Sequence, residues 1–154
     1  MLVVTKEDKI LPPIHVLKGT IDESTRFENL FDLNARLLQL NCHFVTRINS
    51  MGIKEWMIFF QKFRESGGVL AFFELSPPLV STVAAISGFI EKEEIKSFCL
   101  RYACQTCDRT TLKTLSPKEL MNNLQDMQGT ACSHCGGSAE LDDVLEKYVQ
   151  LFQE

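Results

Sequence analysis

The chain has 154 residues, of which 45% are hydrophobic and 23% are charged. This composition is typical of a soluble globular protein with one domain, or one domain and a small appendage. No apolar stretch approaches the ~20 residues of a membrane span, and the N-terminus lacks the pattern of a signal peptide. We therefore expect a reducing, cytoplasmic location, where disulfides are rare and the six cysteines serve other purposes.

The net charge of −4 is concentrated at the C-terminal end of the chain. From residue 136 onward, the single basic residue Lys147 faces five acidic residues: Glu140, Asp142, Asp143, Glu146 and Glu154. A nucleic-acid-binding protein usually shows the opposite sign, clustered where phosphates dock. The charge therefore argues against nucleic acid as a partner.

The first forty residues predict two strands and a helix. The strands are expected at residues 2–4 and 10–18, on either side of a polar turn, with Pro12 and Pro13 at the edge of the second. Asp22 or Ser24 is a suitable N-cap for a helix that runs to about residue 40. One face of this helix would carry Phe27, Leu30, Phe31, Asn34 and Leu38.

The next sixty residues continue the alternation of strands and helices. Short strands are expected at 43–48 and 69–73, and a last strand at 93–102. Between them, residues 53–66 form a helical pattern that ends at a Gly-Gly pair, and Ser76 is a suitable N-cap for a helix that stops near Gly88. The stripe of the first of these helices contains Ile53, Trp56, Met57, Phe60 and Phe63. This order predicts an α/β fold in which helices pack on a mixed sheet.

Four cysteines carry the strongest functional signal in the chain. Cys104 and Cys107 are separated by two residues, as are Cys132 and Cys135, with 24 residues between the two pairs. A two-residue spacing lets one tight turn aim both sulfurs at one ion, and two such turns supply four thiolates for tetrahedral zinc. The glycines that follow Cys135 permit the positive backbone angles that these turns require. We predict a closed, structural zinc site.

Other interpretations of the cysteines remain open. Four thiolates also suit iron, and a single Cys-x-x-Cys pair is compatible with a redox dithiol. His134 lies within the second pair and is a possible replacement ligand, although we expect it to be exposed. Cys42 and Cys99 adjoin apolar strand residues and are expected to pack in the core.

The residues around the cysteine pairs predict two further helices. Ser116 and Pro117 form a helix start between the pairs, and residues 141–152 have apolar side chains at helical spacing. Asp142 and Asp143 would lie at the N-terminal end of the last helix, where its dipole favours acidic groups. We expect two domains, a first at residues 1–100 and a four-cysteine zinc-ribbon-like module with a C-terminal helix at residues 101–154.

Several short motifs in residues 1–100 resemble the STAS domain, the fold of bacterial anti-sigma factor antagonists and of the cytoplasmic domain of sulfate transporters. They are the Lys-Gly-Thr-Ile-Asp element at 18–22, the Ile-Asn-Ser-Met-Gly-Ile turn at 48–53, and the Ser-Pro-Pro-Leu-Val segment at 76–80. The resemblance implies a STAS-like mixed sheet covered by helices. The cysteine module is an addition to the standard domain.

The STAS family has a phosphorylation switch at a turn that this resemblance places at residues 49–52. Asn49 stands where the family has aspartate, Ser50 where it has its first serine, Met51 at the phosphoacceptor and Gly52 at the glycine. Because Met51 cannot accept phosphate, the usual switch is not expected at that position, although Ser50 remains as a neighbouring hydroxyl at a helix N-terminus. Asn49 or Ser50 is expected to cap the following helix.

Together these features predict a non-catalytic bacterial regulatory protein. A protein partner would bind the turn of Asn49, Ser50, Met51 and Gly52 and the helix after it, with apolar contact from Met51, Ile58 and Phe59. One alternative is a nucleic-acid-associated zinc ribbon. An enzyme is the weaker alternative, because there is no Gly-rich phosphate loop and the three histidines, His15, His43 and His134, do not cluster in sequence.

Overall fold

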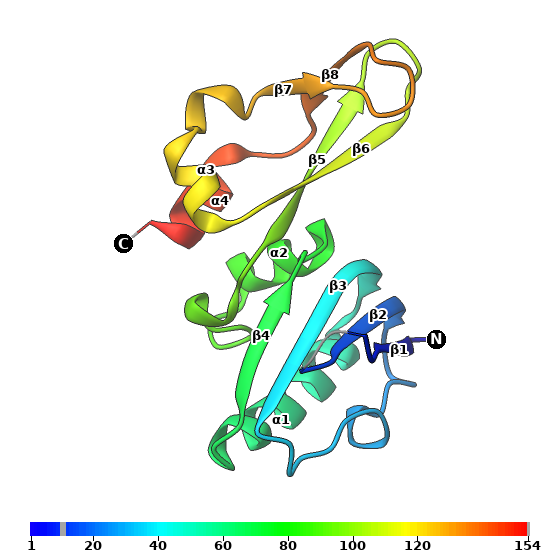
Figure 1. The fold of residues 1–154 in the computed structure, drawn as a ribbon, viewed down its shortest axis with the longest axis vertical. Helices are drawn as coiled ribbons and strands as arrows, with labels where there is room; N and C mark the ends of the chain where they lie inside the picture. Colours follow the sequence, from blue (N-terminus) through cyan, green and yellow to red (C-terminus); the bar gives the residue numbers. More distant parts are fainter. Residues whose placement is uncertain (10–11, 154) are drawn as a thin grey trace.

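The computed structural model describes residues 1–9 and 12–153 and contains two four-stranded sheets (Figure 1). Figure 1 shows the first sheet in the lower half of the molecule and the second sheet in the upper half. The start of the strand expected at 10–18 lies outside the described residues. No helix in the described part of the chain is long and apolar enough to cross a membrane.

The first sheet is mixed, with the strand order β1-β2-β3-β4. It consists of β1 (Val3–Glu7), β2 (Ile14–Ile21), β3 (Leu37–Ile48) and β4 (Val69–Phe73). β1 runs antiparallel to β2, whereas β2, β3 and β4 are parallel to one another. Helix α1 (Ser50–Glu65) connects the parallel strands β3 and β4, whereas the connection from β2 to β3 is an irregular segment. The prediction of a mixed sheet with helices is confirmed.

Helices α1 (Ser50–Glu65) and α2 (Pro77–Ala85) bury apolar side chains against this sheet. The predicted stripe of α1 is confirmed at its centre, where Trp56, Phe60 and Phe63 are fully buried. Trp56 stacks on Phe72 of β4, and its indole N–H donates to the carbonyl oxygen of Phe89 at 3.1 Å. The one polar atom of this large side chain is therefore satisfied inside the core.

The prediction of a helix from residue 22 to about residue 40 is wrong. The segment contains only a single 3-10 turn, η1 (Phe27–Asn29), and β3 begins at Leu37. The Asp22 carboxylate accepts hydrogen bonds from the backbone N–H and hydroxyl of Ser24, which stabilises a local turn in place of a helix. Phe27 is still buried, because this turn places its ring edge-on to Trp56.

The last strand of the first half also starts later than expected. Residues 92–94 form a 3-10 turn, η2 (Lys92–Glu94), and the strand is β5 (Phe98–Cys104). The Glu94 carboxylate makes a two-point contact with the Arg64 guanidinium, at 2.6 and 2.9 Å. This half-buried ion pair fixes the turn against the end of α1.

The second sheet is antiparallel, with the order β6-β5-β8-β7. Its other strands are β6 (Thr110–Leu115), β7 (Gly129–Ala131) and β8 (Ser138–Leu141). The helix start predicted at Ser116 is confirmed by α3 (Pro117–Asn122), which has a reciprocal capping box between Ser116 and Glu119. A 3-10 turn, η3 (Leu124–Asp126), follows α3.

The C-terminal helix, α4 (Leu145–Phe152), is shorter than expected, because residues 138–141 belong to β8. Asp143 accepts hydrogen bonds from the Tyr148 hydroxyl and the Lys147 ammonium, both at 2.7 Å. α4 packs its buried Tyr148 and Phe152 on the ring of Phe98. The two halves therefore share one hydrophobic core, and the boundary expected at residue 100 falls within β5.

Replacing Trp56 by alanine should reduce the free energy of unfolding by about 3–5 kcal/mol, because it empties a fully buried site among aromatic rings. Urea denaturation of metal-saturated protein measures this change. Met51→Asp, at an exposed position of the same helix, is the control and should cost only about 0.5 kcal/mol. Equal losses for the two variants would contradict the core described here.

Candidate metal centre

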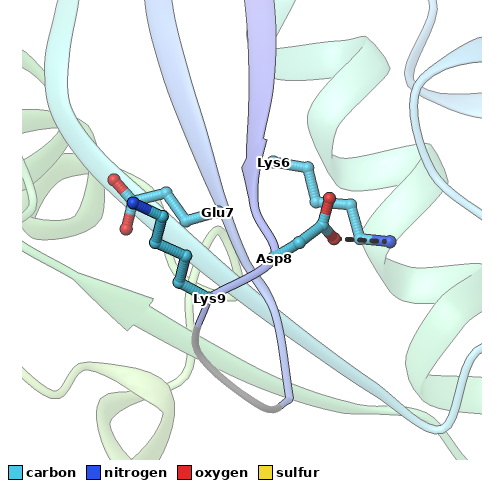
Figure 2. Close-up of a pocket in the computed structure, with 4 residues that line it drawn as sticks. All are labelled: Lys6, Glu7, Asp8 and Lys9. Carbon is cyan, nitrogen blue, oxygen red and sulfur yellow. Dashed lines mark ion pairs between the residues drawn. The ribbon is translucent and has the colours of Figure 1, made fainter.

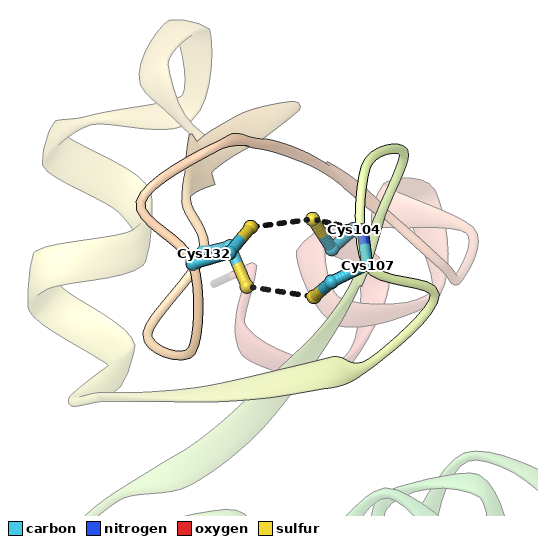
Figure 3. Close-up of side chains that lie close together, drawn as sticks. Cys104, Cys107 and Cys132 are labelled. Carbon is cyan, nitrogen blue, oxygen red and sulfur yellow. Dashed lines mark hydrogen bonds between the residues drawn. The ribbon is translucent and has the colours of Figure 1, made fainter.

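The four cysteines come from two turns that face each other across the second sheet. Cys104 is the last residue of β5, and Cys107 lies in the turn to β6. Cys132 follows β7, and Cys135 lies in the turn to β8. Figure 3 shows Cys132 approaching Cys104 and Cys107 from the opposite side.

The sulfur positions match a tetrahedral four-thiolate site. The Sγ atoms of Cys104 and Cys135 are 3.5 Å apart, those of Cys107 and Cys132 are 3.7 Å apart, and all four lie within 4.8 Å of one another. Zinc–sulfur bonds of about 2.3 Å imply sulfur–sulfur separations of about 3.8 Å in a tetrahedron. A disulfide would need about 2.05 Å. Within residues 1–9 and 12–153, no other set of three or more metal-ligating side chains converges in this way.

Backbone N–H groups point at the sulfurs and stabilise their thiolate forms. The N–H groups of Thr106 and Cys107 donate to Cys104 Sγ at 3.3 and 3.4 Å. His134 N–H donates to Cys132 Sγ at 3.3 Å. Gly137 N–H donates to Cys135 Sγ at 3.4 Å. These donors offset part of the negative charge of four clustered thiolates.

The same hydrogen bonds separate the cysteines by acidity. Backbone N–H groups of Cys135 and His134 lower the pKa of the Cys132 thiol to about 6, and those of Cys107 and Thr106 lower the pKa of Cys104. Cys107 accepts one N–H from Arg109, yet burial and the neighbouring sulfurs raise its pKa to about 12. Without an ion, protons would thus remain on part of the cluster, so metal binding must release them.

Two residues provide the left-handed backbone conformation that the cysteine turns need. Gly136 has φ = +74°, as expected for the glycines after Cys135. In the first turn the corresponding conformation belongs to Asp108, at φ = +58°. Aspartate is among the few residues with a side chain that visit this region routinely.

The side chains of the other candidate ligands do not join the four sulfurs. His134 Nε2 is 3.1 Å from the carbonyl oxygen of Thr110, so this ring is engaged with β6. Cys42 and Cys99 are buried in the core, as expected. Burial raises the pKa of Cys99 to about 11 and raises that of Cys42 further. The sequence did not reveal that Cys99 Sγ lies 3.5 Å from His43 Nδ1, because these residues are 56 positions apart.

The 49–52 turn lies at the start of α1, on the first sheet. Asn49 is the N-cap, and its side-chain oxygen accepts from Gly52 N–H at 2.8 Å, which confirms the capping interpretation. Ser50 and Met51 are exposed. Gly52 is buried, and a Cβ at this position would collide with the carbonyl oxygen of Ile21. Glycine at position 52 is therefore required by internal packing. Phe59, which was expected at a partner face, is a core residue.

A surface hollow of about 600 Å³ at the end of β1 is lined by Lys6, Glu7, Asp8 and Lys9 (Figure 2). Lys6 Nζ lies 3.1 Å from Asp8 Oδ1, and both side chains are more than half exposed. Alternating charges in contact with water are typical of a solvated turn. We assign no site to it.

Comparison with known proteins identifies one distant relative. The chain is similar to peptide chain release factor subunit 1 of Methanocaldococcus jannaschii, with 27% identity over 92 residues. The aligned part is 59% of this chain but only 21% of that relative. No family model matches the chain, and no solved structure matches it. This similarity is too partial to carry a function.

Purified protein should contain about one zinc ion per chain, because four convergent thiolates satisfy tetrahedral zinc. Elemental analysis measures the stoichiometry. Cys104→Ser should reduce it strongly, and His134→Ala, the matched control in the second turn, should leave it unchanged. Metal-free protein with six freely titrating thiols would contradict the site. A red protein with thiolate charge-transfer bands would show that the ion is iron.

Proposed function

We propose that this chain is a non-catalytic, STAS-like regulatory protein that binds a protein partner through the 49–52 turn and the outer face of α1. The proposal includes a structural zinc ion in the second sheet. The order β1-β2-β3-β4, with one antiparallel and two parallel pairings, is compatible with a STAS-like sheet. A signalling role like that of an anti-sigma factor antagonist, with a regulatory protein as the partner, is the corresponding expectation.

The observation that carries the proposal is an apolar stripe on the solvent side of α1. Met51 is 47% exposed and Ile58 is 43% exposed. These residues are seven positions apart, so they lie on the same side of the helix. A shallow hollow of about 260 Å³ adjoins Ile58, with Leu33 and Phe59 in its lining and three charged side chains, Glu28, Glu55 and Lys62. An apolar centre with charged residues around it is the usual composition of a protein interface.

Two side-chain hydrogen bonds of Asn49 hold the turn at the start of this stripe in the absence of a partner. Asn49 caps α1 through its side-chain oxygen, and its side-chain N–H donates to Glu23 Oε2 at 2.9 Å. This hydrogen bond also lowers the pKa of the Glu23 carboxyl, which keeps it ionised beside the turn. A preformed turn loses little conformational entropy on binding. Because Met51 carries no hydroxyl, we propose binding that does not depend on phosphorylation at this position.

The zinc ion would have a structural role. Four thiolates fill all four tetrahedral positions and leave none for a water or a substrate. The ligands belong to the ends of strands in the second sheet, whose shortest strands, β7 and β8, have three and four residues. Strands this short gain little from their own packing, so the ion would supply much of the stability of this sheet.

A Met51→Asp variant should lose at least about tenfold in partner affinity, because a charge replaces the apolar centre of the contact. Partners captured from native lysate by wild-type protein are identified by mass spectrometry, and each affinity is then measured with purified components. Val144→Asp, another exposed apolar position, is the control and should bind normally. If Met51→Asp unfolds the protein, or binds every partner as wild type does, the proposed face is wrong.

A further inference from the structure

In the part of the chain that the structure describes, α1 and α2 pack on one face of the first sheet, and an aromatic and cationic row crosses the other face. Val3, Lys18 and Phe44 pair directly across β1, β2 and β3. Residues that pair across strands lie on the same face of the sheet. Leu17, the neighbour of Lys18, is fully buried, so this row lies on the face opposite the core. Val3 is 45% exposed and Phe44 is 50% exposed.

Two rings and two cations gather at the end of this row. The ring of His43 lies edge-on to that of Phe44, with 4.8 Å between their centroids. Lys18 Nζ is 5.9 Å from the centroid of Phe44. Arg47 is exposed and pairs with Thr20, beyond a register shift between Gly19 and Thr20. Because Ile21, the next residue of β2, is fully buried, Thr20 and its partner Arg47 lie on the same outer face as Lys18. We call Lys18, His43, Phe44 and Arg47 the ring–cation surface.

We propose that the ring–cation surface binds single-stranded nucleic acid. A base would stack on the exposed ring of Phe44, and Lys18 and Arg47 would contact the phosphates on either side. Proteins that bind single strands without strong sequence preference combine these two elements, aromatic platforms for bases and cations for the backbone. The half-exposed ring of Phe44 leaves room for a planar base to stack on it.

Local charge supports this proposal, although the net charge of the chain does not. The excess of acidic residues lies after residue 136, in the second half of the molecule. The Glu74 carboxylate lies 4.0 Å from His43 Nδ1. It is already engaged, because it accepts hydrogen bonds from Asn41 at 2.6 Å and from Thr114 at 3.2 Å. Lys18 and Arg47 have no carboxylate within 4.0 Å among the described residues.

The observations favour nucleic acid over an acidic protein segment. Both ligands would satisfy the two cations. An exposed ring beside two cations offers a stacking platform for a base and contacts for its flanking phosphates, whereas an acidic protein segment would use the cations alone. The surface is also distinct from the α1 stripe, which lies on the helical side of the same sheet. Failure of the nucleic-acid proposal would therefore leave the proposed function intact.

Fluorescence anisotropy of full-length, metal-loaded protein with labelled oligouridine and oligothymidine tests the proposal. We expect saturable binding whose log affinity falls with log salt concentration at a slope of about −1.4, from about −0.7 for each of two phosphate contacts. Phe44→Leu, which keeps an apolar side chain but removes the ring, should weaken binding about tenfold. Lys18→Gln should reduce the slope by about half.

Lys54→Gln removes an exposed cation from α1 and is the matched control, which should change neither affinity nor slope. The absence of saturable binding to both oligonucleotides would overturn the proposal, as would an unchanged affinity of Phe44→Leu. Equal effects of Lys54→Gln and Lys18→Gln would show that attraction is spread over the whole surface, which also contradicts a defined site. Tighter binding of polyglutamate than of either oligonucleotide would assign the face to an acidic protein partner instead.

Discussion

Strand β5 belongs to both halves of the molecule, and the arrangement of the metal centre depends on it. Its first residue, Phe98, forms a parallel bridge with Leu75, just beyond the end of β4. Its middle is buried at Leu100 and Tyr102, and the Tyr102 hydroxyl donates to the carbonyl oxygen of Met127 at 2.7 Å. Its last residue, Cys104, is one of the four convergent cysteines. The position of the first thiolate is therefore fixed by the hydrophobic core.

Because β5 fixes the position of Cys104, the four cysteines belong to the second sheet, and the two sheets differ in the sites that they carry. The second sheet is small, and a metal ion at its four cysteines would close it without leaving a coordination position for chemistry. The first sheet offers two accessible surfaces, the stripe of Met51 and Ile58 on α1 and the ring–cation surface on the opposite face. The proposed recognition surfaces therefore belong to the first half of the chain, and the candidate metal centre belongs to the second half.

The sequence predicted the features that depend on local spacing. Two Cys-x2-Cys pairs predicted the cluster of four cysteines, because each pair needs only one turn to aim its sulfurs. The buried face of α1, with Trp56, Phe60 and Phe63, was likewise predicted from neighbouring residues, as were the N-caps of α1 and α3. The helix predicted at 22–40 does not form, although Phe27, Phe31 and Leu38 have helical spacing. Leu38, Leu40 and Cys42 alternate as in a strand and are buried in β3.

Other features depend on contacts between distant residues, which spacing does not reveal. Phe59 is buried because the irregular segment after β2 places Phe27 and Phe31 over it, at centroid distances of 6.0 Å. Gly52 is required by the carbonyl of Ile21, 31 positions earlier in the chain. The strand predicted from residue 93 starts late because Glu94 is held by Arg64. Each of these errors follows from tertiary packing.

Hydrogen exchange with and without a zinc chelator tests most directly whether the ion holds the second sheet. Because binding of a structural ion contributes to folding free energy, we expect β6, β7, β8 and α4 to lose amide protection on chelation. β3 and α1, whose core residues pack within the first sheet, should keep most of theirs. Unchanged protection of residues 101–153 after complete metal removal would show that the second sheet folds without the ion, and would contradict its structural role.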